Sequence, residues 1–550
     1  MASAIQRDPA AGAKLTNVVG QQELVGEQVR RLGLSQRQIE LNRLYAYARA
    51  QQHENCVVDW DGSRHPTALD RDALASSDFL PEGWKDPGGN LQSMPLRYRR
   101  PSVPCHLGKV IPARFTSLLF GEGTHPTWKV PGQPETEAWC EAVSETYGLW
   151  SKMALVRDLG GAMGTGIVGF KLIASQVIFE EFDPRWCFPT FNPRNPDELD
   201  MLEVRYMFPQ EILDQTTGQW REEKFWYRRI VDKQMDCLWK PTLVGDGSKE
   251  PDWKDKNTVA DLVEHKLGFV PIQWTQNIVV AGDIDGDPDC HGCYDYFDRI
   301  GELKSQAHKG AQRNADPTAT ISSDGQFAQV AMGSDEVLKL EKGGTAGFLE
   351  SSGTAVETAD KEALSIRALA LETAECVLPD QEERDGGPIT ATEINKKSAA
   401  MYSKAARMRV QYGNKCLIPL MGKLIKAVQS VTTATTKDGA IVRGQEIALP
   451  PHVVKGQPQQ YKLDPSAAMQ LKLEWPPFSE PTPEETGQVA TATVALRNAQ
   501  IITAKTATRK VAPYFNIEDI DAEVAQAKKE APAASPDLGA QSLTELNEGR

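Results

Sequence analysis

The chain has 550 residues, of which 40% are hydrophobic and 25% are charged, a composition typical of a globular protein that can bury several cores. No apolar run approaches the roughly 18 residues needed to cross a bilayer, so we expect no association with a membrane. The formal net charge of −14 argues against a protein that grips nucleic acid over its whole surface, but it leaves DNA open as a cargo, because weak attraction lets a polyanion slide.

The first 34 residues are polar and weakly patterned, which predicts a flexible arm. Helical spacing of apolar residues begins near Ser35 and returns in residues 96–120 and 136–163. Residues 176–278 are rich in Trp, Tyr, Phe and Val and are interrupted by Pro and Gly. We therefore predict a helical region followed by a region rich in strands.

Gly164, Gly166 and Gly169 match the spacing G-x-G-x-x-G of dinucleotide-binding loops. That fingerprint requires a strand before it and a helix after it, whereas here a helical pattern precedes the glycines and a strand-like run follows them. The residues therefore predict a tight turn from helix to strand and no nucleotide cofactor.

Two of the nine cysteines, Cys290 and Cys293, form a C-x-x-C pair, the spacing of half a zinc site or of a redox pair. No second C-x-x-C pair and no His pair lies within the usual spacing of a zinc site. We predict no metal, no cofactor and no catalytic residue, and keep an enzyme that depends on this pair as an alternative.

Two helical segments of similar length, 294–314 and 355–378, flank a short mixed segment of strands and turns. The second segment has an apolar stripe that includes Val356, Ala363 and Ala370. Each helix would be about 30 to 36 Å long. The pattern predicts two antiparallel legs that carry a small domain at their far end.

An acidic loop with two glycines follows the second leg and leads into a long helical pattern that runs from Ile394 to Val428. Thr390 and Glu393 have the spacing of a capping box, and Pro419 is expected to kink the helix. Some 38 residues at about 1.5 Å each would span nearly 60 Å, which suits a helix that crosses an assembly. We therefore expect a mobile acidic loop that is attached to a rigid long helix.

The remaining residues begin with a polar stretch that favours strands, 431–473, and continue through the proline-rich hinge EWPPFSEPTPEE. Helices are predicted at 485–500 and 517–529. The last twenty residues are polar and rich in Ala, Ser and Pro, which predicts disorder.

This ordered set of pieces resembles the portal proteins of tailed bacteriophages, the rings at one capsid vertex through which DNA enters and leaves. The resemblance rests on order and spacing over roughly residues 95 to 530, and no single motif carries it. The matching pieces are LGFVPIQWTQN before the first leg, ADPTATISSDG after it, DQEERDGGPITATEIN, CLIPLMGKLI at the end of the long helix, and EWPPFSEPTPEE with ALRNAQIITAKTA and FNIEDIDAEVAQAKKE behind it.

The resemblance implies an α+β fold of the portal kind, with an α/β wing, a two-helix stem, a small α/β clip, a long kinked wing helix and a helical crown. The implied division is a flexible arm at 1–34, the wing at 35–290, stem helix 1 at 291–315, the clip at 316–353, stem helix 2 at 354–378, the tunnel loop at 379–390, the long wing helix at 391–430, a strand-favouring wing and hinge segment at 431–482, the crown at 483–530 and a disordered tail at 531–550.

The resemblance also implies a function and partners. About twelve copies would form a ring-shaped channel at one capsid vertex of the virion, assembled in the host cytoplasm, for packaging, retention and ejection of double-stranded DNA. The clip would dock the terminase large subunit and later the head-tail adaptor proteins, and the ring would meet the major capsid and scaffold proteins. No catalysis is required. A structural capsid or scaffold protein without a channel is the second alternative.

Candidate DNA contacts on the first leg are Lys304 and Arg313, which we expect to share one face and to point into the channel, with Lys309 pointing elsewhere. Charges that face solvent or a neighbouring subunit are the alternative reading of both residues.

The tunnel loop supplies the other candidates. Its Gln381 and Arg384 are expected to touch DNA; an acidic loop without any such contact is the alternative. The surrounding residues would keep the contact loose or supply hinge freedom, and they are Glu382, Glu383, Asp385, Gly386 and Gly387.

Overall fold

The structure, a computed structural model, describes residues 34–52, 57–58, 64–65, 103–173, 176–213, 218–244, 259–315, 318–322, 345–349, 353–378, 398–429, 433–435, 441–443, 452–454, 457–459, 463, 466, 470–478, 483–499, 501–512 and 520–530. The predicted N-terminal arm (to residue 33), the tunnel loop, the start of the long helix and the C-terminal tail lie outside these ranges. The chain divides into two units, which are Met1–Glu383 with Lys397–Pro476, and Arg384–Lys396 with Pro477–Arg550.

The first helix of unit 1 begins where the sequence predicts it. In α2 (Gln36–Ala48), the Ser35 side chain accepts a hydrogen bond from the amide of Gln38, and the Gln38 side-chain oxygen accepts one from the amide of Ser35, a capping box that satisfies two amides at the helix start. Two short strands follow, β1 (Val57–Val58) and β2 (Arg64–His65), paired with each other.

Three further helices lie in the described N-terminal part of unit 1. They are α4 (Leu107–Phe120), α5 (Pro134–Thr146) and α6 (Leu149–Met163). The sequence pattern treated 136–163 as one helical stretch, but the structure breaks it at Gly148. That residue has φ +65°, a left-handed conformation that a continuing helix cannot contain.

The glycine cluster forms the predicted turn from helix to strand. Gly164 ends α6 with φ +86°, and the next residue starts β4 (Thr165–Ile173). The order is therefore helix, glycine, strand, which confirms the prediction and is the reverse of a dinucleotide-binding loop. β4 lies between β5 (Gln176–Phe182) and β12 (Ile272–Gln276) in a three-stranded antiparallel sheet.

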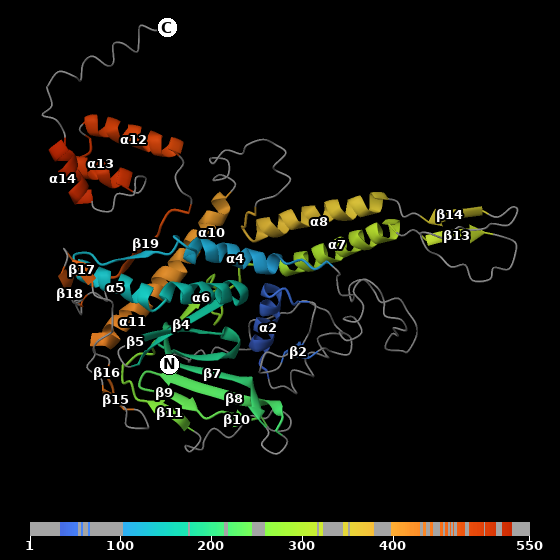
Figure 1. Ribbon diagram of the computed structural model, residues 1–550, viewed down its shortest axis with the longest axis horizontal. Coiled ribbons are helices and arrows are strands. Elements are labelled where there is room, and N and C mark those ends of the chain that lie inside the picture. Colours follow the sequence, from blue (N-terminus) through green and yellow to red (C-terminus); the bar gives the residue numbers. More distant parts are fainter. Residues whose placement is uncertain are drawn as a thin grey trace, which may run out of the picture. The chain divides into compact units, whose positions relative to one another are not determined.

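The strand-rich prediction for residues 176–278 is confirmed by a second, larger sheet (Figure 1). A short 3₁₀ turn, Pro184–Trp186, leads into it. Its strands, in spatial order, are β11 (Val259–Val263), β9 (Asp236–Trp239), β8 (Trp220–Asp232), β7 (Asn195–Leu213) and β6 (Cys187–Asn192), with β10 (Thr242–Leu243) also paired to β8.

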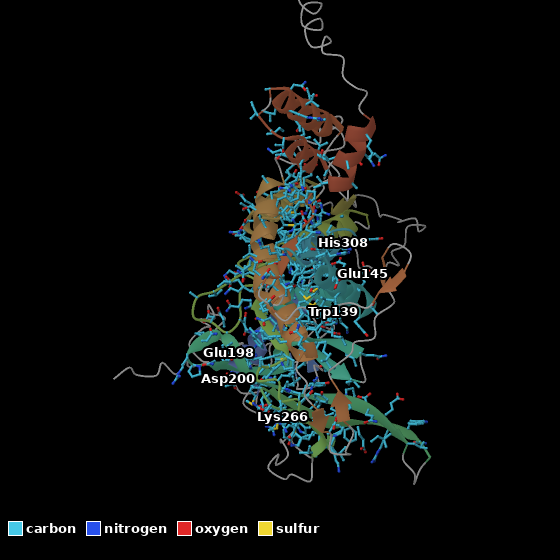
Figure 2. The ribbon with its side chains drawn as sticks, turned by 90° about the vertical axis from the view of Figure 1, so that its left-hand side faces the viewer. Trp139, Glu145, Glu198, Asp200, Lys266 and His308 are labelled. Carbon is cyan, nitrogen blue, oxygen red and sulfur yellow. The ribbon has the colours of Figure 1, made fainter. Side chains whose placement is uncertain are left out.

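The two sheets share one apolar core. Ile167 and Ile272 of the small sheet pack with Leu202 and Val231 of the large one, and all four side chains are almost fully buried. Figure 2 shows Glu198 and Asp200 of β7 close together, and both pair with Lys233, at 2.5 and 2.8 Å.

Two helices joined through a pair of strands follow the sheets (Figure 1). The chain runs through α7 (Tyr294–Ala315), β13 (Thr318–Ser322), β14 (Thr345–Leu349) and α8 (Gly353–Thr373). β13 and β14 are antiparallel, and the predicted helix pair is present. The second helix is shorter than predicted, because Glu375 takes φ +52° directly after the last turn.

The long helical pattern has three parts within the described residues, α10 (Ala399–Arg409), a π-helix (Val410–Leu417) and α11 (Ile418–Gln429). The amide of Ile418 donates to the carbonyl of Gly413, five residues back. Pro419, where a kink was predicted, has no amide for the carbonyl of Lys415, and the Gln273 side chain donates to that carbonyl instead, at 2.8 Å. The irregularity in the helix therefore begins before the proline.

Short antiparallel pairs complete unit 1. They are β15 (Thr433–Thr435) with β16 (Ile441–Arg443), β17 (His452–Val454) with β18 (Gln457–Gln459), and β19 (Lys472–Glu474) with β3 (Thr127–Lys129). The strand-favouring pattern of residues 431–473 is thus confirmed as small hairpins.

Unit 2 contains three helices in its described part, α12 (Pro483–Asn498), α13 (Ala504–Val511) and α14 (Ile520–Glu530). The first and third match the predicted helices, with α14 beginning three residues later than expected. The helix α13 was not predicted from the sequence.

The chain is therefore a mixed α+β protein, as predicted. None of the described helices combines the length and the apolar character that crossing a bilayer requires. The division of these elements into a wing, a stem, a clip and a crown stays a prediction.

Candidate functional site

The most distinctive feature of the fold is the segment from α7 through β13 and β14 to α8, which we call the leg. The two helices pack side by side and run antiparallel (Figure 1). Three contacts between them fix their register, Cys293 Sγ with the Ala370 carbonyl at 3.5 Å, Arg299 with Glu362 at 3.2 Å and Lys304 with Asp360 at 2.9 Å. Chain continuity places the β13–β14 hairpin at the end of the leg away from Cys293.

Small residues let the two helices approach closely. Ala363 and Ala370 of α8 are 1% and 0% exposed, and Ala307 of α7 is buried as well. At Gly310, an added Cβ atom would stand 2.7 Å from Val356 Cγ2, so even a methyl group would crowd the interface. The pair is held by close backbone packing as well as by charge.

α7 is also held from its other side. Tyr47 of α2 donates a hydrogen bond to Asp298 at 2.7 Å, and its ring lies 4.7 Å from that of Tyr294. The backbone amide of Val103 donates to Ser305 Oγ at 3.0 Å. Burial raises the pKa of Asp298 to about 6, although the hydrogen bond from Tyr47 acts in the opposite direction.

Much of α8 is exposed. Its buried residues lie on the side that faces α7, whereas Leu364 and Leu369 are 43% and 49% exposed. The Lys361 and Glu372 side chains are exposed on the same helix, as is His308 on α7, labelled in Figure 2. The exposed surface of the leg therefore carries polar and charged side chains together with two large apolar ones.

A buried lysine joins the two ends of the leg at its base. Lys404 of α10 is only 4% exposed, and its Nζ atom donates to the carbonyls of Asp289, just before α7, and Ala374, just after α8, at 3.0 and 2.7 Å. The ammonium group also lies 5.1 Å from the ring centre of Phe115. One side chain thus joins the bases of both leg helices to α10.

Beside Lys404 lies a buried ion pair between α6 and the segment that leads into α7. Arg157 and Asp289 are both fully buried, and Arg157 Nη2 lies 2.9 Å from Asp289 Oδ2. Burial alone would lower the pKa of Arg157, but the adjacent carboxylate raises it. Asn277 donates to Asp289 at 2.9 Å, and the hydroxyl of Tyr412 donates to Asn277 at 3.1 Å. These four side chains connect α6, the end of β12, the leg and the π-helix.

Further contacts tie α10 to its surroundings. Arg407 pairs with Glu375, at the end of the leg, at 2.7 Å. Arg409 donates to the carbonyl of Pro476 at 2.7 Å and lies 5.0 Å from the ring centre of Trp475. Burial lowers the pKa of Arg409 to about 10. α10 is therefore the element on which the leg base is mounted.

The C-x-x-C pair belongs to this base. Cys290 and Cys293 are buried, and the amide of Cys293 donates to the carbonyl of Cys290 in the turn that starts α7. Burial raises the pKa of the Cys293 thiol to about 11, and that of Cys290 also lies well above its usual value. Such thiols stay protonated at neutral pH and are poor nucleophiles and metal ligands. Among the described residues, no group of three or more His, Cys, Asp or Glu side chains is placed to hold a metal ion.

The predicted DNA-contact residues fall into two groups. Gln381 and Arg384, together with the acidic and hinge residues of the tunnel loop, lie outside the described residues. Lys304 and Arg313 both lie on α7. The expectation that they share a face is wrong, because nine residues at 100° each place them about half a turn apart. Lys304 is turned toward Asp360 of α8, with its side chain 36% exposed.

The junction at the leg base could not be predicted from the sequence. Arg157, Asp289 and Lys404 come from segments far apart in the chain, and none of them stands in a recognisable motif. The only signal was Lys404 itself, a charged residue on the apolar side of a helical pattern, next in the sequence to a buried alanine.

Comparison with known proteins does not assign the chain to a family. No model of a known protein family matches the chain, and a search of curated protein sequences found no match.

Proposed function

We propose that the chain forms a ring around a channel for double-stranded DNA, as a portal protein at one vertex of a phage capsid. In this proposal α7 and α8 are the stem, the β13–β14 segment is the clip, α10 to α11 form the long wing helix, and α12 to α14 form the crown. The leg is the observation that carries the proposal, because two antiparallel helices fixed at one end and joined by strands at the other are suited to line a channel.

The attachment of the leg supports a mechanical role. Lys404, the pair Arg157–Asp289 and Tyr47 hold the base of the leg at several points, all of them buried or half-buried. A buried, charge-assisted hydrogen bond resists opening, because each unpaired group would keep its desolvation cost. The leg is thus built to transmit force, which a channel wall needs when DNA moves through it.

The surface charge supports the same role. About twelve copies at −14 each would carry on the order of −170 charges, and such a wall repels phosphate except at a few basic positions. Arg313 on α7 and Gln381 and Arg384 of the tunnel loop are the proposed contacts. The partners in this proposal are DNA, the terminase large subunit, the head-tail adaptor proteins, and the major capsid and scaffold proteins.

The exposed leucines of α8 provide a test of ring assembly. Replacing Leu364 and Leu369 with Gln should leave the fold of one copy intact, since both are already in solvent, and should shift rings toward monomers because an apolar contact between neighbours is lost. Mass photometry of the purified chain measures this shift.

The matched control is Leu155→Gln on α6, where the side chain is 48% exposed and lies away from the leg. Rings that survive Leu155→Gln but not the double change on α8 support the proposal. A wild-type chain that stays monomeric, or equal assembly of both variants, contradicts it.

The tunnel loop provides a separate test of DNA handling. Deleting residues 381–386 should spare ring assembly and impair packaging or genome retention. A normal phage yield from the deletion variant would exclude a role for this loop in DNA contact.

A further inference from the structure

Positive charge in unit 2 is concentrated in one stretch. Residues 486–517 contain no Asp or Glu, although the chain as a whole has 75 of them in 550 residues. The same stretch holds four cations, which are Arg497, Lys505, Arg509 and Lys510. A strongly acidic protein therefore has a local patch with no acidic residue of its own to neutralise it.

The helix α13 orders three of these cations on its outer side. Thr503 caps the helix, its side chain accepting from the amide of Thr506, and Ala507 forms the buried side with 7% exposure. Lys505 and Arg509, four residues apart, lie on one exposed face. Lys510 is exposed about 100° further around the helix.

These cations differ in their surroundings from those of the long helix, whose residues 394–437 also lack Asp and Glu. There, Lys404, Arg407 and Lys415 each bind a carbonyl or a carboxylate of another element. In contrast, Arg497, Arg509 and Lys510 form no ion pair or side-chain hydrogen bond within the described structure. Their charge is directed at solvent.

We propose that the exposed face of α13, formed by Lys505, Arg509 and Lys510 together with Arg497 at the end of α12, binds the phosphates of duplex DNA. Arginine presents a planar fork that matches phosphate oxygens, and neighbouring lysines add point charge. The choice of DNA as the bound polyanion rests on the proposed function. The location of the site rests instead on the charge and exposure of these residues.

The test uses the full chain and a fluorescently labelled 30-base-pair duplex of mixed sequence. Anisotropy titrations over a series of salt concentrations give the slope of log K against log salt, which is about −0.9 per phosphate contact. The double variant Arg509→Gln, Lys510→Gln should bind more weakly at low salt, and its slope should be shallower by about 2.

The control variant is Lys240→Gln, Lys426→Gln, which removes the same charge from two exposed positions of unit 1. The proposal predicts a wild-type slope for this control. Equal weakening of both variants, or no binding by the wild type, overturns it. Mass photometry of the same samples reports ring assembly separately, so a failure of the DNA site can be distinguished from a failure of the ring.

Discussion

Gly164 is the residue whose replacement the backbone tolerates least. Its φ of +86° is costly for any side chain, and an added Cβ atom would stand 1.9 Å from the carbonyl oxygen of Gly286. Its own carbonyl accepts hydrogen bonds from the amides of Asn277 and Gly286, at 2.8 and 3.2 Å. The turn from α6 to β4 therefore needs glycine for two independent reasons, the conformation and the space.

A pair of alanine substitutions separates these reasons. Gly164→Ala should lower the free energy of unfolding by more than about 3 kcal/mol, because backbone atoms must move. Gly123→Ala should cost only about 1 kcal/mol, since its φ is +72° but no atom lies within 4 Å of the added methyl group. Urea unfolding followed by circular dichroism measures both. Equal costs would show that the clash at Gly164 is relieved without strain.

Asp298 should make the stability of the leg base depend on pH. Its pKa is about 6 in the folded chain, above the ordinary value of 3.8, so the folded state binds the proton more tightly than the unfolded state. The stabilisation is present below pH 4 and is lost as pH rises through 6, by on the order of 3 kcal/mol. In Asp298→Asn, which keeps an acceptor for Tyr47, this loss should disappear. Melting temperatures of both proteins between pH 4 and 7 test it, and parallel curves would refute it.

Single residues also mark the limit of prediction from the sequence. Arg157 and Asp289 are 132 positions apart, and their pairing depends on how α6 and the leg base pack, which no spacing rule reveals. Even within one helix, the expectation that Lys304 and Arg313 share a face was wrong, because residues nine positions apart lie about half a turn apart around the helix. The glycine turn was predictable, because both its flanking patterns are local.

At the scale of elements, Lys404 is the connection between α10 and both ends of the leg. Lys404→Met should cost about 2 to 4 kcal/mol, since two buried carbonyls lose their donor. The loss should be concentrated at the leg base and should speed hydrogen exchange in residues 289–297 and 370–376. Lys426→Met, at an exposed position of α11, is the control and should change stability by less than about 0.5 kcal/mol. Unchanged exchange in these segments would show that Lys404 does not hold the leg.

Elements with a strong apolar period were the easiest to predict, whereas some short or irregular elements were missed. α7 and α8 were found because one side of each is buried, and β4 to β12 because β-branched and aromatic residues are concentrated there. α13 was missed because it has eight residues and buries little beyond Ala507. The π-helix was missed as well, since its extra residue per turn leaves no mark on a pattern read at 3.6 residues per turn.

At the scale of the whole molecule, the sequence supported the mixed fold and the order of its segments, but it could not show the junction on which the leg is mounted. That junction depends on α6, α10 and the residues on either side of the leg, which the chain brings together only when it folds. The same limit applies to the assembly. In the proposed ring, the exposed Leu364 and Leu369 would contact a neighbouring copy.

Electron microscopy of the purified, negatively stained wild-type chain can show whether the chain forms a channel. We expect rings with a central hole wide enough for a DNA duplex, built from about twelve copies of the 60.6 kDa chain. Closed particles without a hole, or single copies at every concentration tested, would contradict it.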